Sequence, residues 1–165
     1  MSENITTSTS IINLAVESVA ALINALSLFA NISRGAMGTG NCLVCEVGPT
    51  TPETVWLDKN KYIPLDLTIN GKHSSLRTLS DAMNTIHESL TMMTSYPSGT
   101  GWKITDIATL TEPQVIGRES NDWIMASALT VKIATNLPVP APIPDPTPTP
   151  EPTPTPEPDT EPEQE

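Results

Sequence analysis

The segment from Asn136 to Glu165 is so rich in proline that it excludes a packed fold for that part of the chain. It holds twelve of the seventeen prolines and seven acids without a base, and it includes the hexapeptide Pro-Thr-Pro-Thr-Pro-Glu twice in succession. Proline fixes φ and lacks a backbone donor, so it suits neither a helix interior nor a strand ladder. We therefore expect residues 136–165 to be a disordered polyproline II tail that is dispensable for folding, and residues 1–135 to form one domain.

The charge balance of residues 1–135 is ordinary once the tail is set aside. The chain carries 19 acidic and 8 basic side chains, and removing the seven acids of the tail leaves 12 against 8, a net charge of −4. Such a balance offers no basic patch of the kind that binds nucleic acid. We expect no direct nucleic-acid specificity.

The most apolar stretch, Ile11 to Ile32, reaches the length of a membrane span, but polar residues interrupt it. Glu17, three asparagines and several serines lie within it, and no basic residue precedes it. A signal peptide would need a positive segment first and then a shorter apolar core. We therefore expect a helix that packs within protein, and no membrane partner.

Two apolar stripes run along this expected helix, with the spacing of an α-helix face. The first stripe is Ile12, Val16, Val19, Ile23, Leu26 and Ala30, and the second is Ala15, Leu22, Ala25 and Phe29. A helix that is apolar on two sides needs more cover than one small sheet gives, so burial against a neighbouring subunit and a central position in a monomer are both open. The candidate interface residues on this helix are Ile12, Val16, Val19, Ile23 and Leu26.

Cys42 to Val47 is expected to form a short apolar strand, and its two cysteines could bind a metal, cycle between redox states or remain free. A zinc site needs about four ligands, and beyond Cys42 and Cys45 the chain offers only His73 and His87, without ligand spacing. A redox pair favours a helix N-terminus, whereas positions three apart on a strand face opposite sides. We interpret both cysteines as buried free thiols in a reducing cytoplasm, without a metal.

The next segment predicts two strands. Thr54 to Leu57 is a short one, and Ile63 to Ile69 alternates apolar and polar residues as a half-buried strand does. Pro64 cannot donate to a ladder, so this strand should have an edge there or begin there. Asn70-Gly71 supplies the expected turn.

A second helix is expected from a Ser74 or Ser75 cap to about Thr94. Its apolar stripe is Leu76, Leu79, Met83, Ile86, Leu90 and Met93, and its wet face carries Arg77, Asp81, Asn84, Thr85 and Glu88. His87 lies beside the stripe without a partner pattern, so we interpret it as a boundary residue rather than a catalytic base. Tyr96 to Gly101 should end the helix.

Two final strands are expected at Trp102 to Thr111 and at Asp122 to Thr135. The connection between them, Glu112 to Asn121, is too long for a two-residue hairpin turn and presents apolar residues beside charged ones. Such a loop is a candidate contact surface, and the alternative is a disordered hairpin tip. Its candidate interface residues are Pro113, Gln114, Val115, Ile116, Arg118 and Glu119.

The order of these elements predicts an α+β fold: a small mixed or antiparallel sheet of about four to five strands with two main helices. No nucleophile is paired with a base, no two carboxylates have catalytic spacing, and the glycines of Arg34 to Gly40 are not followed by Gly-Lys-Ser/Thr. We therefore expect no enzyme activity and no cofactor.

Several short sequence segments, taken in their order along the chain, resemble those of a known family. They are Ile69-Asn-Gly-Lys-His73, Tyr96-Pro97, Trp102-Lys-Ile-Thr-Asp-Ile107, Pro113-Gln-Val-Ile-Gly-Arg-Glu119 and Trp123-Ile-Met-Ala-Ser-Ala-Leu-Thr-Val-Lys-Ile133. With the helix after His73, they look like the small proteins of Gram-positive tailed phages called minor capsid proteins, which are similar to tail terminators. The resemblance covers residues 62–133, and the proline tail and the Cys42 pair depart from it.

The resemblance implies a structural virion protein. Tail terminators form a hexameric ring on the last ring of the tail tube, stop its polymerisation and face the head-side neck. The implied partners are further copies of this chain, the tail tube protein, neck or connector proteins and, where one is present, a sheath protein. The implied location is the head-proximal end of the virion tail, after synthesis in the host cytoplasm.

The terminator could belong to a phage or to a phage-tail-like particle that lacks a head. Two alternatives stay open beside it. One is a head-tail connector or another tail component of similar fold. The other is a surface-binding domain on a Pro/Thr stalk, since acidic Pro/Thr tracts also serve as spacers.

Overall fold

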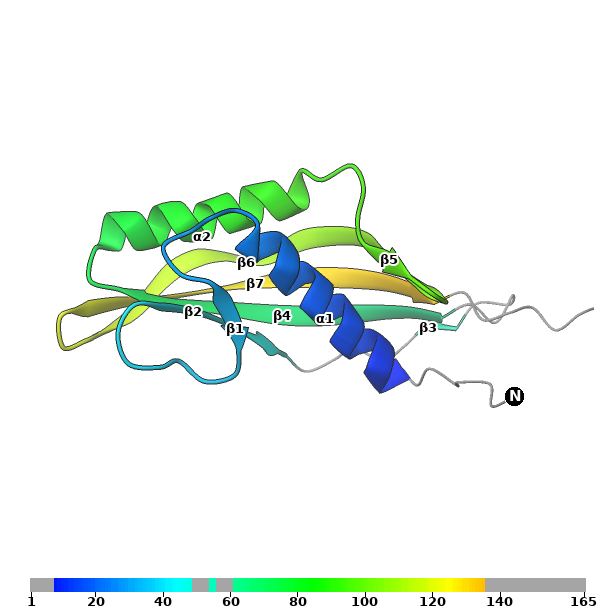
Figure 1. Ribbon diagram of the computed structural model, residues 1–165, viewed down its shortest axis with the longest axis horizontal. Coiled ribbons are helices and arrows are strands. Elements are labelled where there is room, and N and C mark those ends of the chain that lie inside the picture. Colours follow the sequence, from blue (N-terminus) through cyan, green and yellow to red (C-terminus); the bar gives the residue numbers. More distant parts are fainter. Residues whose placement is uncertain (1–7, 49–53, 56–60, 136–165) are drawn as a thin grey trace, which may run out of the picture.

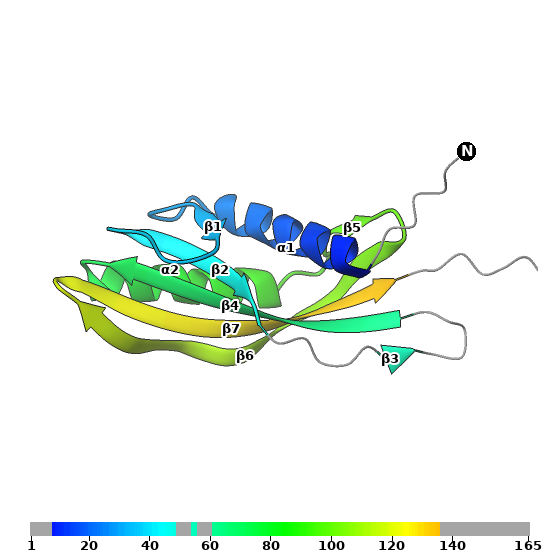
Figure 2. The ribbon, with the colours of Figure 1, turned by 90° about the horizontal axis from the view of Figure 1, so that it is seen from below.

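In the computed structural model, which describes residues 8–48, 54–55 and 61–135, one curled sheet carries two helices on one of its faces (Figure 1, Figure 2). The helices are α1 (Ser8–Asn24) and α2 (Leu76–Thr91). The strands are β1 (Ile32–Arg34), β2 (Cys42–Val47), β3 (Thr54–Val55), β4 (Lys61–His73), β5 (Ser98–Gly99), β6 (Trp102–Glu119) and β7 (Asp122–Thr135). The expected tail at 136–165 lies outside the described residues, as do the last two residues of the strand expected at Thr54 to Leu57.

The strand order is β1-β2-β4-β7-β6-β5, with β3 paired to β4 off this path. Only β1 and β2 are parallel, and the other pairs are antiparallel. The prediction of an α+β fold with two helices is confirmed, but the sheet has seven strands rather than four to five. The sequence did not predict β1, which begins at the last residue of the stretch assigned to the first helix, or β5, which has only two residues.

The first helix is shorter than expected, because the apolar stretch contains a helix and a turn and ends where the strand β1 begins. After Asn24 the chain reverses, with Ser27 at a positive φ of 53°. The side-chain oxygen of Asn24 accepts a hydrogen bond from the backbone nitrogen of Ile32, at 2.7 Å. Asparagine and serine side chains compete with the helix for backbone partners in this way. Leu26 and Ala30 consequently lie beyond the helix, and Ile32 begins β1.

The core lies between the helices and the sheet. The apolar stripe of α2 faces it as predicted, with Leu79, Met83, Ile86 and Leu90 all buried. The side chain of Ser75 caps this helix by accepting a hydrogen bond from the backbone nitrogen of Thr78, at 3.3 Å. The helix ends at Thr91, close to the predicted Thr94.

The turn expected at Asn70-Gly71 is wrong, since β4 runs through both residues to His73. Gly71 pairs with Leu43 of β2 and with Met125 of β7. A side chain at Gly71 would place its Cβ 2.6 Å from Leu79 Cδ1 and 3.1 Å from Leu43 Cδ2. This glycine therefore serves close packing of α2 on the sheet rather than a change of direction.

Pro64 lies at a local edge, as predicted. On one side β4 is paired with β7 along its whole length. On the other side β3 pairs with Lys61 and Tyr62 and β2 pairs with residues 67–72, so residues 63–66 have no strand partner there among the described residues. The missing proline donor therefore breaks no ladder bond.

The loop expected between Glu112 and Asn121 is also wrong, because β6 continues to Glu119 and the turn is only Ser120 and Asn121. The register between β6 and β7 shifts at four places, one of them between Thr111 and Gln114. A bulge at that place accommodates Pro113 within the strand. The sequence therefore looks irregular although the hairpin is continuous.

The hairpin turn between β6 and β7 lies at the opposite end of the molecule from the start of α1 and the end of β7. In Figure 1 the turn between β6 and β7 is at the far left, beyond the first turn of α2. The start of α1 and the end of β7 are both at the right.

Candidate assembly surface

β6 carries three exposed apolar side chains. Leu110 and Ile116 are each 56% exposed and Val115 is 46% exposed. Gln114 is exposed and Pro113 is partly buried between them. The part of the predicted surface that comes from this segment is therefore accessible in the subunit.

The bulges of β6 favour contact through side chains rather than through its backbone. β5 pairs only with Trp102 and Lys103, and the rest of the outer edge of β6 has no strand partner among the described residues. A long flat edge would invite strand addition, whereas bulges and an edge proline discourage it. The four register shifts and Pro113 supply both features here.

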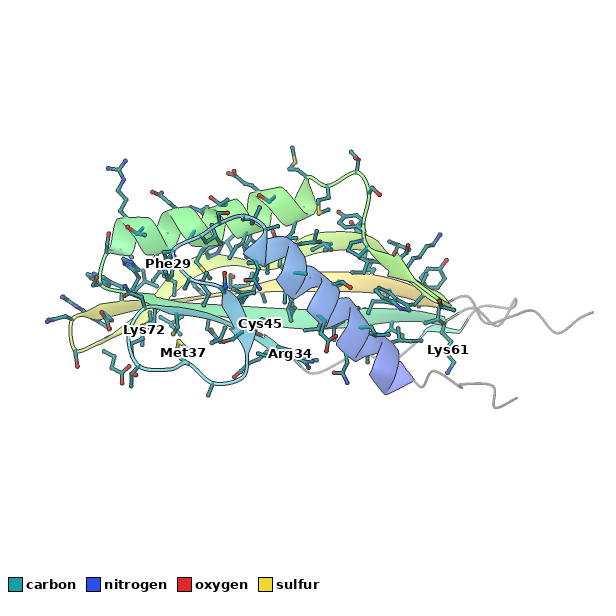
Figure 3. All side chains as sticks on the ribbon, viewed as in Figure 1. Phe29, Arg34, Met37, Cys45, Lys61 and Lys72 are labelled. Carbon is teal, nitrogen blue, oxygen red and sulfur yellow. The ribbon has the colours of Figure 1, made fainter. Side chains whose placement is uncertain are left out.

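The end of the hairpin is anchored on both faces of the sheet. On one face Lys72 of β4 donates a hydrogen bond to Glu119 across β7, at 2.5 Å. That bond lowers the pKa of the Glu119 carboxyl and raises the pKa of Lys72. On the other face the guanidinium of Arg118 lies 4.8 Å from the ring centre of Trp123. Figure 3 shows Lys72 near this end of the sheet.

The candidate interface residues of the first helix do not join this surface. Val16, Val19 and Ile23 are buried in the core of the subunit itself, at no more than 1% exposure, and Ile12 and Leu26 are partly buried against that core. A helix turns its most apolar stripe to its own sheet when that sheet is large enough to cover it. The accessible side of α1 carries Leu14 and Glu17 instead.

A shallow, open hollow lies near the opposite edge of the sheet, where β1 and β2 meet. Its volume is about 350 Å³, and its lining is Arg34, Gly35, Cys45, Glu46 and Val47. The guanidinium of Arg34 donates to the side-chain oxygen of Asn13 of α1 at 3.1 Å. Val47 is 37% exposed, and Met37 in the preceding loop is 37% exposed as well. Figure 3 shows Arg34 and Cys45 near α1.

The two cysteines are free thiols on opposite faces of β2, as predicted. Cys45 pairs with Ile69 on the helix face, and Cys42 pairs with Lys72 on the other face. Cys45 is almost fully buried whereas Cys42 is partly exposed, so the prediction of two buried thiols holds only for Cys45. Burial raises the pKa of the Cys45 thiol, which disfavours the reactive thiolate.

His87 is buried rather than at the boundary of the core. Its Nδ1 lies 3.0 Å from the hydroxyl of Thr109 on β6. Its Nε2 and the hydroxyl of Ser127 on β7 are buried without a hydrogen-bond partner among the described residues. Burial lowers the pKa of His87, against an opposing effect of the Glu112 carboxylate.

The buried His87 predicts a loss of stability on mild acidification. The unfolded chain takes up the proton near pH 6.5, while the folded subunit resists it. The stability contributed by the neutral ring is therefore present above that pH and is lost as the pH falls toward the lower folded pKa. His87→Gln should flatten the dependence of the unfolding free energy on pH between about pH 7 and 5, as measured by urea denaturation. An unchanged slope in His87→Gln would contradict the assignment.

Two residues of the accessible surface were not found from the sequence. Leu110 was counted within a regular strand, and Val47 ended a strand taken as buried. A signal for Leu110 exists, because Ile104 and Ile107 are both buried at a spacing of three. Such spacing in a strand indicates a bulge, after which the next apolar residue can face outward. The hollow itself has no sequence signal.

Two searches of the described segments give negative results. They contain no group of three or more His, Cys, Asp or Glu side chains that could hold a metal ion. Neither α1 nor α2 has the length and apolar character needed to cross a membrane.

The chain was compared with known proteins in sequence and in structure. The sequence matches no protein-family model and no curated protein. Among solved structures it is similar to a chain from "Virion of native gene transfer agent (GTA) particle". The TM-score is 0.49 at 11% identity, over 74% of this chain and 91% of that chain. A likeness at this level carries no conclusion about fold or function.

Proposed function

We propose that this protein is a structural subunit of a tailed-phage virion that caps the tail tube as a ring, ends tube polymerisation and forms the head-proximal face of the tail. The observation that carries the proposal is the ordered set of short sequence segments between Tyr62 and Ile133 that resembles the tail-terminator family. The role is one of assembly rather than of catalysis.

The accessible surface of the subunit supports an assembly role. Val115 and Ile116 belong to one of the sequence segments that resemble the tail-terminator family. Both are exposed on a hairpin whose end is anchored on both faces of the sheet. Exposed apolar side chains held on a rigid element are a common starting point for a protein interface, because their burial needs little ordering. The partners proposed for this surface are further copies of the chain and the terminal ring of the tube.

The proposal is tested by adding the purified full chain to its tube protein during tube polymerisation. We expect shorter tubes that carry a ring at one end in negative-stain electron microscopy, and mass photometry should detect that ring, of six subunits, free or on tube ends. A chain that stays monomeric at high concentration and leaves tube length unchanged would overturn the proposal. Binding to the portal side without any effect on tubes would favour the head-tail connector instead.

A further inference from the structure

Exposed large apolar side chains lie toward both sides of the sheet. Leu110, Val115 and Ile116 are on β6, and Val47 lines the hollow at the β1 and β2 edge, while one more, Tyr62, is on the inner strand β4. In the strand order, β1 and β6 are separated by β2, β4 and β7. A closed ring is built from head-to-tail contacts, which need two different patches that complement each other. The two patches lie on opposite sides of the sheet, as a head-to-tail contact requires.

The two patches differ in form. On β6 the exposed side chains of Val115 and Ile116 lie at a bulge between Val115 and Gly117 on the outermost long strand. The opposite patch is hollowed, with a volume of about 350 Å³. The hollow is shallow and open, so an aliphatic side chain of a neighbouring subunit can reach its lining.

Each patch carries one acidic and one basic side chain, so charges of opposite sign can pair between the two patches. Glu112 and Arg118 flank the apolar residues of β6, and all of these are exposed. The hollow is lined by one base, Arg34, and one acid, Glu46, which are also exposed. An acid and a base on each side permit Glu112 to face Arg34 and Arg118 to face Glu46, which favours one orientation of docking over its reverse.

Resting on the proposed ring, we infer that the apolar residues Val115 and Ile116 of one subunit insert into the hollow at the β1 and β2 edge of the next copy of this chain. The contact is head-to-tail, so every subunit contributes both its β6 patch and its hollow. Val47 and Arg34 therefore belong to the same interface as Ile116 although they lie on the opposite side of the subunit.

Cysteine cross-linking between Val47 and Ile116 tests this contact in the full chain. In a Cys42→Ser, Cys45→Ala background, the pair Val47→Cys with Ile116→Cys should give a reducible ladder of covalent multimers on a non-reducing gel under assembly conditions. Each single variant should give no ladder. The control pair Val47→Cys with Met92→Cys uses a residue that is 81% exposed elsewhere, and it should give no ladder either.

A second variant covers the case in which the cysteine background fails to fold. Val47→Trp fills the hollow without touching β6, and it should weaken self-association about tenfold or more while the circular dichroism spectrum stays unchanged. Assembly of the wild type combined with no ladder, dimers from Ile116→Cys alone, or normal assembly of Val47→Trp would each overturn this contact and leave the proposed function standing. A wild type that neither self-associates nor acts on tubes would overturn both.

Discussion

Replacing Val115 and Ile116 together by aspartate is expected to abolish assembly while the subunit stays folded. Both side chains are about half exposed, so the two charges remain hydrated in the isolated subunit and cost little stability. In an interface the same charges would lose their water without gaining partners, which costs several kcal/mol at the centre of a contact. Light scattering should show only monomers, and added tubes should grow without a cap.

The matched control for this double variant is Met92→Asp, since Met92 is the most exposed large apolar residue of the described segments, at 81%. It adds a charge at the end of α2 and should leave assembly at the wild-type level. Thermal unfolding of all three proteins separates loss of assembly from loss of fold. Wild-type tube capping by the Val115→Asp, Ile116→Asp variant would show that β6 is not an assembly surface.

The change Val19→Asp should instead unfold the subunit. Val19 has no exposed surface and lies in the core beside Ile23 and Val16. An unpaired carboxylate at such a position destabilises a protein by about 3–5 kcal/mol, a large fraction of the stability of a small domain. Urea denaturation followed by circular dichroism measures the loss, and the expected result is a poorly folded or insoluble protein.

The control on the same helix is Ala21→Asp, which places the same charge on the exposed side of α1. Its unfolding free energy should stay within about 0.5 kcal/mol of the wild type, as for surface substitutions in general. If a Val19→Asp protein unfolds like the wild type but does not assemble, the apolar stripe of α1 belongs to a subunit interface rather than to the core. The pair of variants therefore separates the two roles that the sequence left open for this helix.

The elements that the sequence predicted well are those in which one periodicity holds throughout. The alternation from Ile63 to Ile69 and from Trp123 to Ile133 places both sets on the helix face of the sheet, where the register pairs Ile63 with Ile133 and Ile69 with Ser127. In α2 a spacing of three and four continues from Leu79 to Leu90, and every apolar member is buried. A single buried face fixes both register and orientation in such segments.

The elements that the sequence predicted badly are those in which a local signal competes with tertiary packing. Asn70-Gly71 has the composition of a turn, but Leu79 of α2 occupies the space that a side chain at Gly71 would take. Pro113 and the adjacent charges resemble a loop, but bulges allow β6 to continue past them. The stretch after Asn24 keeps a helical spacing, but a side-chain hydrogen bond to Ile32 turns the chain into β1.

The candidate surface was predictable only in part for the same reason. Residues 113–119 stood out because apolar and charged side chains alternate irregularly there, and the structure exposes Val115 and Ile116. The hollow depends on where β1 ends against β2, which no local pattern records. Its lining includes Arg34 of β1 and Cys45 of β2, which are 11 positions apart in the sequence but directly paired in the sheet.

The positions of the start of α1 and the end of β7 decide how this protein can be modified without disturbing the hairpin. β7 runs the length of the sheet from the hairpin turn to its last residue, Thr135, and its 14 residues span about 46 Å at roughly 3.3 Å each. The start of α1 lies at that same far end (Figure 1). A fluorescent protein, an affinity tag or a receptor-binding domain fused directly after β7 would therefore begin some 45 Å from the hairpin turn. A fusion directly before α1 would also begin at the end of the sheet away from that turn.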